Sequence, residues 1–190
     1  MCAILPRDSS VAVTASTTQD GIRQDPIMST AEGPTIHPLI EGRGVNLRPT
    51  TERDLGLLTR WFARPDVVKY WGGAPLPEAE VAAKYIGRRR PAVECFIVEA
   101  DNTATGLIEY HHDGDRRGGI DMVLLEEHRG LGLGRAAAFA LVAFLQEQLH
   151  WSDVTVDPDD WNDDGKAFWI AIGFEHSARS ATITTDSPTF

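Results

Sequence analysis

The chain has 190 residues, of which 42% are apolar and 24% charged, and 28 Asp and Glu against 18 Lys and Arg give a formal net charge of −10. This acidity argues against nucleic-acid binding, which needs clustered cations to pair with phosphates, and it suits a cationic small molecule as partner. Cys2 and Cys95 are too few for a disulfide framework or a thiolate zinc site, and no apolar run reaches the roughly 18 residues of a membrane span, so we expect a cytoplasmic protein.

The first forty residues differ in composition from the rest of the chain. They are rich in Ser, Thr, Gly and Pro, they contain no aromatic residue, and they show no sustained hydrophobic period. A segment of this kind buries too little apolar surface to offset the entropy that it loses on ordering. We therefore expect residues 1–40 to form a disordered or loosely attached leader, followed by one domain over residues 44–190.

The domain is predicted to begin with a strand and two helices. Residues 45–48 alternate between apolar and polar, as an edge strand does. Thr51, with Asp54 three residues later, forms the start signal of a helix that ends at Pro65. A second, shorter helix is expected over residues 77–87, because a proline is favoured in the first turn.

Three strands joined by short turns are predicted next. Apolar and β-branched residues mark strands at 96–98, 105–111 and 120–125, and polar turn residues separate them at 101–102 and 113–115. Consecutive strands with such short connections pair in antiparallel fashion. This part of the chain therefore predicts an antiparallel meander.

The remaining elements alternate between helix and strand. A long helix is expected over residues 133–149 with Phe139 on its apolar face, followed by a short buried strand at 154–156, a helix over 165–172 and a final strand region at 174–184. Alternation of this kind is typical of a parallel βαβ unit. The whole order predicts a single α/β domain with a mixed central sheet, in which an antiparallel N-terminal meander precedes the βαβ half.

A glycine-rich loop lies between the third meander strand and the long helix. Glycines at alternate positions let the backbone come close to a ligand, and the helix N-terminus adds a partial positive charge. These properties are typical of a cradle for a pyrophosphate. The residues expected to form it are Arg129, Gly130, Leu131, Gly132, Leu133, Gly134 and Arg135.

The same loop also satisfies a dinucleotide-binding fingerprint. Residues 132–137 read G-x-G-x-x-A, and Asp157 closes the next strand where a ribose-binding acid is expected. In a dinucleotide-binding domain, however, the strand before the glycine loop opens the domain, whereas here three antiparallel strands are predicted up to that point. The element order therefore disfavours a dinucleotide site.

Another interpretation accounts for more of the chain. Arg129-x-x-Gly132-x-Gly134 resembles the acetyl-CoA loop of the GNAT superfamily of N-acyltransferases, whose pattern is Q/R-x-x-G-x-G/A. Asn162 matches the family asparagine that contacts the CoA arm, and residues 168–174 look like the closing helix of that family. The resemblance covers residues 45–190, and it implies acetyl-CoA as cosubstrate and no metal.

Within that superfamily, residues 70–73 (YWGG), 119–121 (GID) and 156–158 (VDP) look like those of aminoglycoside 6'-N-acetyltransferases. This resemblance implies transfer of an acetyl group to the 6'-amine of an aminoglycoside in a ternary complex, and hence antibiotic resistance, by a monomer or homodimer. Lysine or siderophore-precursor N-acyltransferases share much of the plan and remain an alternative. A non-catalytic CoA-binding module is a third interpretation.

The resemblance also implies roles for residues at the centre of the sheet. Asp121 lies where the family has its acceptor-facing carboxylate, and it is the candidate base or ammonium anchor. An ordinary Asp pKa of about 3.9 against about 10.4 for an alkylammonium makes direct proton abstraction steeply unfavourable, so Asp121 needs a raised pKa, a water relay or a purely electrostatic role. The backbone N–H of Leu124 or Leu125 is expected at the oxyanion. Trp169 stands where a Tyr acid is often found, and packing is its expected role.

The acceptor side is expected to be acidic and aromatic. Adjacent histidines at 111 and 112 point to opposite faces of a strand, so a metal site is not expected there, and Cys95 is expected to be buried and inert. The residues expected around a polycationic acceptor are Trp71, Asp113, Asp115, Asp121 and Asp157.

Overall fold

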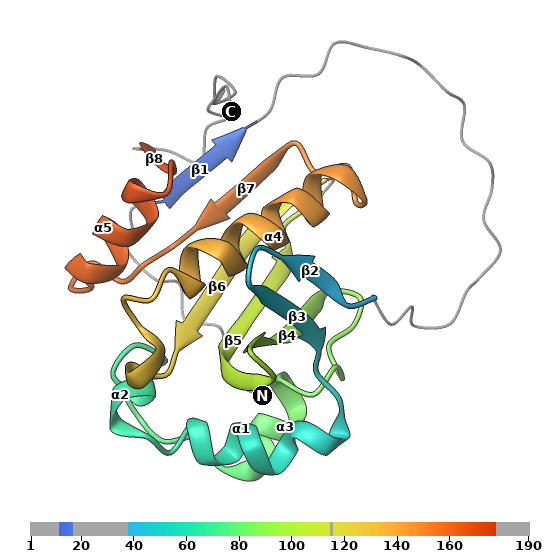
Figure 1. The fold of residues 1–190 in the computed structure, drawn as a ribbon, viewed down its shortest axis with the longest axis vertical. Coiled ribbons are helices and arrows are strands. Elements are labelled where there is room, and N and C mark those ends of the chain that lie inside the picture. Colours follow the sequence, from blue (N-terminus) through green and yellow to red (C-terminus); the bar gives the residue numbers. More distant parts are fainter. Residues whose placement is uncertain (1–11, 17–37, 115, 178–190) are drawn as a thin grey trace, which may run out of the picture.

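The computed structural model describes residues 12–16, 38–114 and 116–177. Within these ranges eight strands form one sheet, in the order β2-β3-β4-β5-β6-β7-β1-β8 (Figure 1). All neighbouring strands are antiparallel except β6 and β7. The strands are β1 (Ala12–Ser16), β2 (Ile40–Gly42), β3 (Val45–Pro49), β4 (Val93–Ala100), β5 (Thr103–His112), β6 (Arg117–Leu124), β7 (Asp153–Val156) and β8 (Glu175–Ser177).

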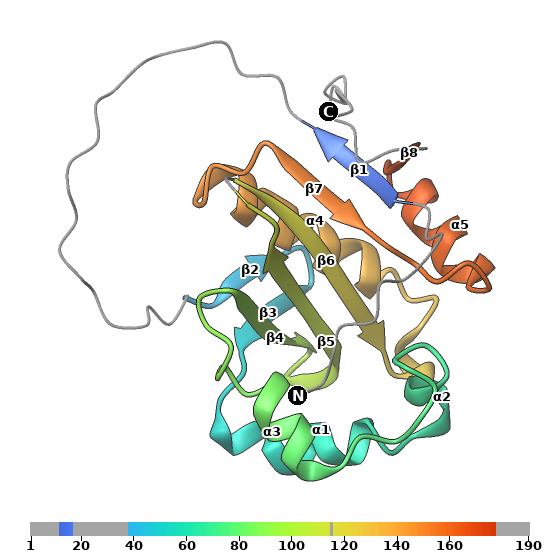
Figure 2. The ribbon, with the colours of Figure 1, turned by 180° about the vertical axis from the view of Figure 1, so that it is seen from behind.

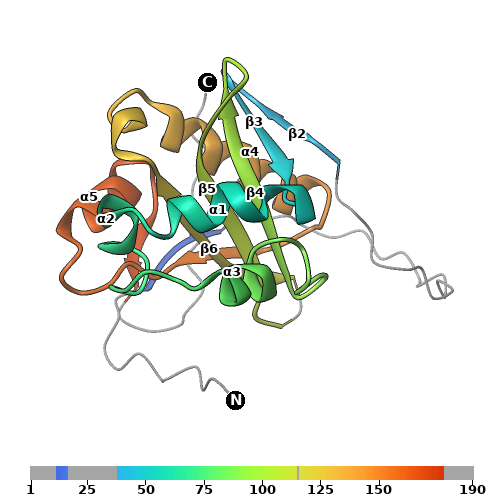
Figure 3. The ribbon, with the colours of Figure 1, turned by 90° about the horizontal axis from the view of Figure 1, so that it is seen from below.

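Helices lie on both faces of this sheet. The α4 helix crosses the front of the sheet in Figure 1, and α1 and α3 run side by side in the view of Figure 3. In the part of the chain that the structure describes, no helix is both long and apolar enough to cross a membrane. The helices are η1 (Glu52–Asp54), α1 (Leu55–Trp61), α2 (Pro65–Val68), α3 (Glu78–Lys84), η2 (Glu126–His128), α4 (Leu133–Glu147) and α5 (Asp163–Ala171).

Two hydrophobic cores lie on opposite faces of the sheet. Because successive side chains of a strand alternate between faces, Phe96 and Val98 of β4 pack in the core under α4, whereas Ile97 packs in the core under α1 and α3. On α4, Leu141 and Leu145 are fully buried. The central strands are therefore apolar on both sides, so a polar side chain buried on them needs a specific explanation.

The strands β6 and β7 separate part of the way along their length. They pair in parallel only from Arg117 to Gly119 of β6, opposite Asp153 to Thr155 of β7, and beyond these residues the two strands diverge (Figure 2). On the other side of β6, a Cβ at Gly118 would lie 1.9 Å from the carbonyl oxygen of His111 in β5, so a glycine is needed there for β6 to pack against β5. The sheet consequently opens toward the carboxyl ends of β6 and β7.

Most local predictions are confirmed. The meander is present as β4, β5 and β6, with Asp101 and Asn102 at positive φ in its first turn. Thr51 and Asp54 form the expected capping box, with the Thr51 N–H donating to Asp54 Oδ2 at 2.8 Å. Pro65 does not simply end a helix: α1 ends at Trp61, and Pro65 is the first residue of the separate helix α2.

Three predictions about position in the fold are wrong. The strand at 45–48 is not at the edge, because β2 pairs outside it. Phe139 is 41% exposed on the outer side of α4 rather than on its buried face. Within the expected leader, residues 12–16 form β1, which pairs with both β7 and β8, while the rest of the leader up to residue 37, and the final strand region beyond residue 177, lie outside the described residues.

Candidate active site

A cavity of about 960 Å³ lies where β6 and β7 diverge. This volume is at the upper end of the range usual for small-molecule sites. Its lining comes from the glycine loop with the start of α4, from the segment between α2 and α3 with α3 itself, from β5 and β6, and from the segment after β7 with α5. Predicted residues that line the cavity are Trp71, Asp121, Leu124, Arg129, Gly130, Gly132, Gly134, Arg135, Asp157 and Asn162.

The glycine loop has the geometry of an anion cradle. Gly130 and Gly132 have φ values of +72° and +81°, and no atom lies within 4 Å of a Cβ built on either residue, so both face open space. Gly132 is the N-cap of the 15-residue helix α4, whose first amides have no partner within the helix. These amides and the helix dipole attract a phosphate. The loop therefore fits the pyrophosphate of CoA.

Gly134 lines the cavity and also allows close packing. It lies in the first turn of α4, where a Cβ would stand 3.3 Å from both the Met122 side chain and the Phe168 ring. The absence of a side chain lets α4 pack closely on β6 and α5. Leu131 and Leu133 do not line the cavity, and the Leu131 side chain is 66% exposed.

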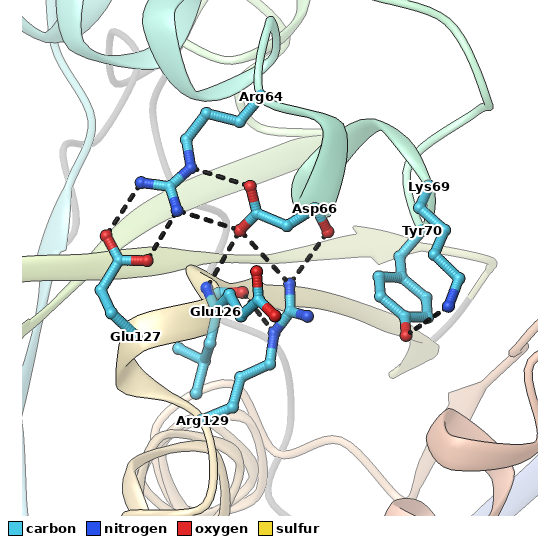
Figure 4. A network of polar contacts seen from close by, with 8 residues as sticks. Arg64, Asp66, Lys69, Tyr70, Glu126, Glu127 and Arg129 are labelled. Carbon is cyan, nitrogen blue, oxygen red and sulfur yellow. Dashed lines mark hydrogen bonds and ion pairs between the residues drawn. The ribbon is translucent and has the colours of Figure 1, made fainter.

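A polar network centred on Asp66 holds the loop in position (Figure 4). The Asp66 carboxylate accepts hydrogen bonds from Arg64 at 2.9 Å and from the Glu126 N–H at 3.0 Å. Arg129 donates to the Asp66 carbonyl and to the Leu124 carbonyl, both at 2.9 Å. The Arg64 hydrogen bonds hold the pKa of Asp66 below its usual range. Arg129 thus joins α2 to the end of β6, and its guanidinium is committed to these contacts.

Asp66 is not predictable as a site residue from the sequence, because an acidic residue just after an Arg-Pro pair has no distinctive signature. Its importance comes from contacts with residues some sixty positions away in the chain, to Glu126 and Arg129. The guanidinium carbon of Arg129 lies over the ring of Tyr70, 5.1 Å from the ring centroid. The Tyr70 ring in turn stacks on Trp161, with 5.8 Å between the ring centroids. An aromatic contact therefore joins the segment after α2 to the segment before α5.

Asp121 and Asp157 lie on the two sides of the opening. Continuing the β6–β7 register past Gly119 and Thr155 by two residues brings these carboxylates opposite each other, at the point where the strands have separated. Asp121 is 40% exposed, and its Oδ2 lies 3.8 Å from the His111 Nδ1. The neighbouring His112 packs on Trp151, so the two histidines point to opposite faces, as predicted.

Asp113 does not join this acidic pair. It lies in the turn between β5 and β6, where its N–H donates to the Arg117 carbonyl, and it does not line the cavity. Arg117 and Asp121 are four residues apart on an extended strand, or roughly 13 Å, so Asp113 belongs to the far end of β6. Asp115 lies outside the described residues.

A buried carboxyl group that the sequence analysis missed lies beside Asp121. Glu109 of β5 is directly opposite Asp121 in the ladder and lines the cavity, although only 6% of it is exposed. Burial, and next the charge of Asp121, raises the pKa of Glu109 to about 7. Cys95 donates its thiol hydrogen to Glu109 Oε2 at 3.0 Å, and burial keeps its own pKa well above the usual range. Cys95 is buried as predicted, but it contacts a polar partner.

The two predicted oxyanion donors differ in availability. The Leu125 N–H donates to the Thr105 carbonyl at 3.0 Å, and Leu125 is buried away from the cavity lining. Because hydrogen bonding alternates along an antiparallel pair, the Leu124 N–H points away from β5, toward the opening beside β7. The prediction is therefore corrected for Leu125, and Leu124 is the residue whose amide faces the cavity.

Three other predicted residues have structural contacts of their own. Asn162 Oδ1 accepts the Gly165 N–H at 2.9 Å and so caps α5. The Trp71 indole N–H donates to the Tyr85 hydroxyl at 2.8 Å. Trp169 is buried between Phe168 and Phe174. All three also border the cavity, so each combines packing or capping with a place in its wall.

A parallel strand pair thus opens beside a glycine-rich helix N-terminus, and the carboxylates of Asp121 and Asp157 line the same cavity as that loop. Residues 45–175 match the acetyltransferase (GNAT) domain family. The chain therefore belongs to the GNAT acetyltransferases, as the sequence analysis predicted.

Similar proteins include aminoglycoside 6'-acetyltransferases. The chain is 30% identical over 162 residues to the aminoglycoside N(6')-acetyltransferases type 1 of Klebsiella pneumoniae and Serratia marcescens, which covers 76% of this chain and 79% of each relative. The structure of AAC(6')-Ib with ribostamycin and coenzyme A matches with a TM-score of 0.64 at 27% identity, over 70% of this chain and 84% of that one. The complex of AAC(6')-Ib with coenzyme A and kanamycin matches with a TM-score of 0.62 at 27% identity, over 69% and 84%.

Proposed function

We propose that this acetyltransferase moves the acetyl group of acetyl-CoA to the 6'-amine of an aminoglycoside, directly within a ternary complex. The proposal depends chiefly on one observation, that Gly130 and Gly132, which have open space around them, line the same cavity as the carboxylates of Asp121 and Asp157. The similarity to aminoglycoside 6'-acetyltransferases supports the choice of acceptor. The proposal includes a cytoplasmic location and a role in antibiotic resistance.

The cosubstrate binds along the glycine wall in this proposal. The amides at the start of α4 hold the pyrophosphate, and the Asn162 side-chain amide, whose oxygen caps α5, keeps its NH₂ group for the CoA arm. Arg129 acts on the cosubstrate indirectly, because its side chain holds the loop against Asp66 and Leu124. When bound, acetyl-CoA supplies the activated acetyl carbonyl.

The acceptor binds in the part of the cavity lined by Asp121 and Asp157, on the two sides of the opening between β6 and β7. Asp121 holds the reacting ammonium by a charge-assisted hydrogen bond, and Asp157 holds a second ammonium across the opening. Trp71, fixed by its bond to Tyr85, borders the same space. A ligand with several ammonium groups suits this part of the cavity, because its ammonium groups can pair with the partly desolvated carboxylates of Asp121 and Asp157.

The chain's groups act on the reaction as follows. The acceptor amine loses its proton and attacks the carbonyl carbon, so the C–N bond forms while the C–S bond breaks. The Leu124 N–H donates to the oxygen that becomes negative. The thiolate leaves with a proton taken from the reacting nitrogen, directly or through water, since the buried Trp169 indole is not an acid of useful strength.

Thiol release from acetyl-CoA tests the proposal. Release with kanamycin, together with 6'-acetylkanamycin identified by mass spectrometry and NMR, is the expected result, and expression in a susceptible bacterium should raise kanamycin tolerance. Release only with a lysine peptide or another amine would favour the lysine or siderophore-precursor alternative. CoA binding by calorimetry without release for any amine would leave a non-catalytic module.

Asp157→Asn tests the acceptor wall, with Asp101→Asn as its matched control. Asp101 lies in an exposed turn at φ 48°, where Asn is well tolerated, so this variant removes the same charge outside the cavity. We expect Asp157→Asn to raise the KM for kanamycin by about 30-fold or more, the equivalent of losing an ion-pair partner worth about 2 kcal/mol. The affinity for acetyl-CoA should not change in either variant. Activity that is indifferent to both Asp157→Asn and ionic strength would contradict a polycationic acceptor.

A further inference from the structure

Three polar side chains form a row across the centre of the sheet. Cys95 of β4 lies opposite Glu109 of β5, and Glu109 lies opposite Asp121 of β6. Because directly opposed residues of neighbouring strands point to the same face, all three face the side of α3. On that face they interrupt an apolar core that includes Leu107 and Val123. The row is therefore a polar insertion in a core and leads to the cavity at its Asp121 end.

Exposure to the cavity distinguishes the two carboxyl groups of this row. Asp121 is 40% exposed, whereas Glu109 is 6% exposed and still belongs to the cavity lining. Two carboxylates this close cannot both ionise without a penalty, so the buried member takes up a proton more easily. The titratable and charged groups that face Glu109 from the packed elements are Cys95 of β4, Asp121 of β6, Lys84 at the end of α3, and Tyr85 and Arg89 just after it.

Resting on the proposed function, we propose that Glu109 accepts the proton of the acceptor ammonium, while Asp121 holds that ammonium in place. The geometry supports this division because Asp121 reaches the open part of the cavity and Glu109 lies directly behind it in the ladder. The Cys95 thiol donates to Glu109 Oε2 and orients the carboxyl group. The glycine-loop motif in the sequence does not point to a base on β5.

The acidity of Glu109 suits the role. Burial, with the charge of Asp121 second, raises its pKa to about 7. Compared with an ordinary glutamate of pKa 4.5, Glu109 at about 7 makes proton transfer from an alkylammonium about 300-fold less unfavourable. Near neutral pH a large fraction of Glu109 is still ionised, so it is able to receive the proton. A pKa close to the working pH is the condition for an effective general base.

The protons balance with Glu109, the two substrates and water. The Glu109 carboxylate takes one proton from the ammonium and becomes a neutral carboxyl group, which leaves the amine with its electron pair. The amine forms the C–N bond as the C–S bond breaks, and the second proton on nitrogen goes to the departing thiolate. Glu109 then returns its proton to water, so each turnover releases one proton overall.

The pH dependence of kcat/KM for kanamycin and acetyl-CoA tests this role. In the wild-type enzyme we expect a rise through an apparent pKa near 7, as is expected for an ionising base in the free enzyme. In Glu109→Gln the rise near pH 7 should disappear and kcat should fall about 100-fold or more. Glu109→Asp should keep the rise with a smaller loss of kcat. Glu99→Gln, which removes a half-buried carboxylate paired with Arg48 outside the cavity, should leave the profile unchanged.

The titration of Glu109 itself supplies a second readout without catalysis. ¹³C NMR of the glutamate carboxyl carbons measures it, and the Glu109 signal is assigned because it disappears in Glu109→Gln. The Glu109 signal should titrate with a midpoint at a pH of about 7, whereas ordinary glutamates titrate at about 4.3. In Asp121→Asn the midpoint should fall, because a like charge is removed. A Glu109 midpoint below about 5 in the wild-type protein would overturn the inference whatever the acceptor is.

The two readouts separate this inference from the proposed function. Acetylation of kanamycin by a Glu109→Gln enzyme whose profile still rises near pH 7 would overturn the role of Glu109 and leave the proposed function standing. Acetylation of a different amine, with the rise lost in Glu109→Gln, would refute the proposed acceptor and support the role of Glu109.

Discussion

Replacing Glu109 by glutamine should change how the stability of this protein depends on pH. The pKa of Glu109 is raised from 4.5 to about 7 in the folded protein, so between these values the folded state binds a proton that the unfolded state has lost. A raised pKa contributes stability that is complete below pH 4.5 and is lost as the pH rises through 7. Glutamine has nearly the same shape and does not titrate, so the variant lacks this loss.

The magnitude follows from the two pKa values. One pKa unit corresponds to about 1.4 kcal/mol, and the part of the difference that lies between pH 5 and pH 8.5 amounts to about 2–3 kcal/mol. Because Glu109 is only 6% exposed, solvent screening reduces this value little. Relative to the wild-type protein, Glu109→Gln should therefore gain about 2–3 kcal/mol of unfolding free energy between pH 5 and pH 8.5.

Urea unfolding of both proteins at the two pH values measures this gain. The quantity compared is the unfolding free energy of the variant minus that of the wild-type protein, at pH 8.5 and at pH 5. The contributions of all other titrating groups cancel in this comparison where their surroundings are unchanged. Glu99→Gln, measured in parallel, should show no such gain, because Glu99 pairs with Arg48 at 2.8 Å outside the cavity and has no carboxylate opposite it in the ladder. An equal difference between variant and wild type at pH 5 and pH 8.5 would refute the reasoning about Glu109.

Three further changes test the cradle, its support and the core. Gly132→Asp should abolish CoA binding in calorimetry. Position 132 has a φ of +81°, and an aspartate there would project a negative charge into the space expected for a pyrophosphate. A folded variant with unchanged affinity would contradict the cofactor assignment. Asp66→Asn should lower the free energy of unfolding by about 1–3 kcal/mol and raise the KM for acetyl-CoA, because it weakens the charged hydrogen bonds that join α2 to the loop. An unchanged KM would show that the loop does not need this support. Leu141→Ala should cost about 2–5 kcal/mol in urea unfolding, because Leu141 is fully buried on the inner face of α4. A cost below about 1 kcal/mol would mean that the core under α4 is loosely packed.

Local sequence signals predicted the parts of this protein that depend on neighbouring residues. The capping pair Thr51 and Asp54, the turn at residues 101–102 and the glycine loop before the long helix all depend on short-range hydrogen bonds or on backbone φ. The antiparallel meander was predictable for the same reason, because short turns leave few alternatives for pairing. The resemblance to the GNAT family rested on these local patterns and is confirmed.

Position within the sheet was less predictable. The alternation at residues 45–48 identified a strand, but it could not show that β2 would pair outside it. The composition of the first forty residues gave no sign that Ala12–Ser16 would lie between β7 and β8. Asp113 and Asp121 are close in sequence, yet the length of β6 separates them. In each case the decisive factor is strand pairing, which joins residues that are distant in the chain.

The sequence by itself determined that a glycine-rich loop follows a meander and opens a long helix, and that acidic residues occur in the neighbouring segments. Only the tertiary structure decided which carboxyl groups meet. Glu109 reads in the sequence as one polar residue in an apolar strand, and its chemistry comes from the pairing that brings Cys95 and Asp121 to its two sides. Arg129 likewise fits a ligand-binding motif, but Asp66 and the Leu124 carbonyl engage its side chain. The physical reason is that burial and neighbouring charges set the pKa of a group, and both depend on residues that the fold brings together.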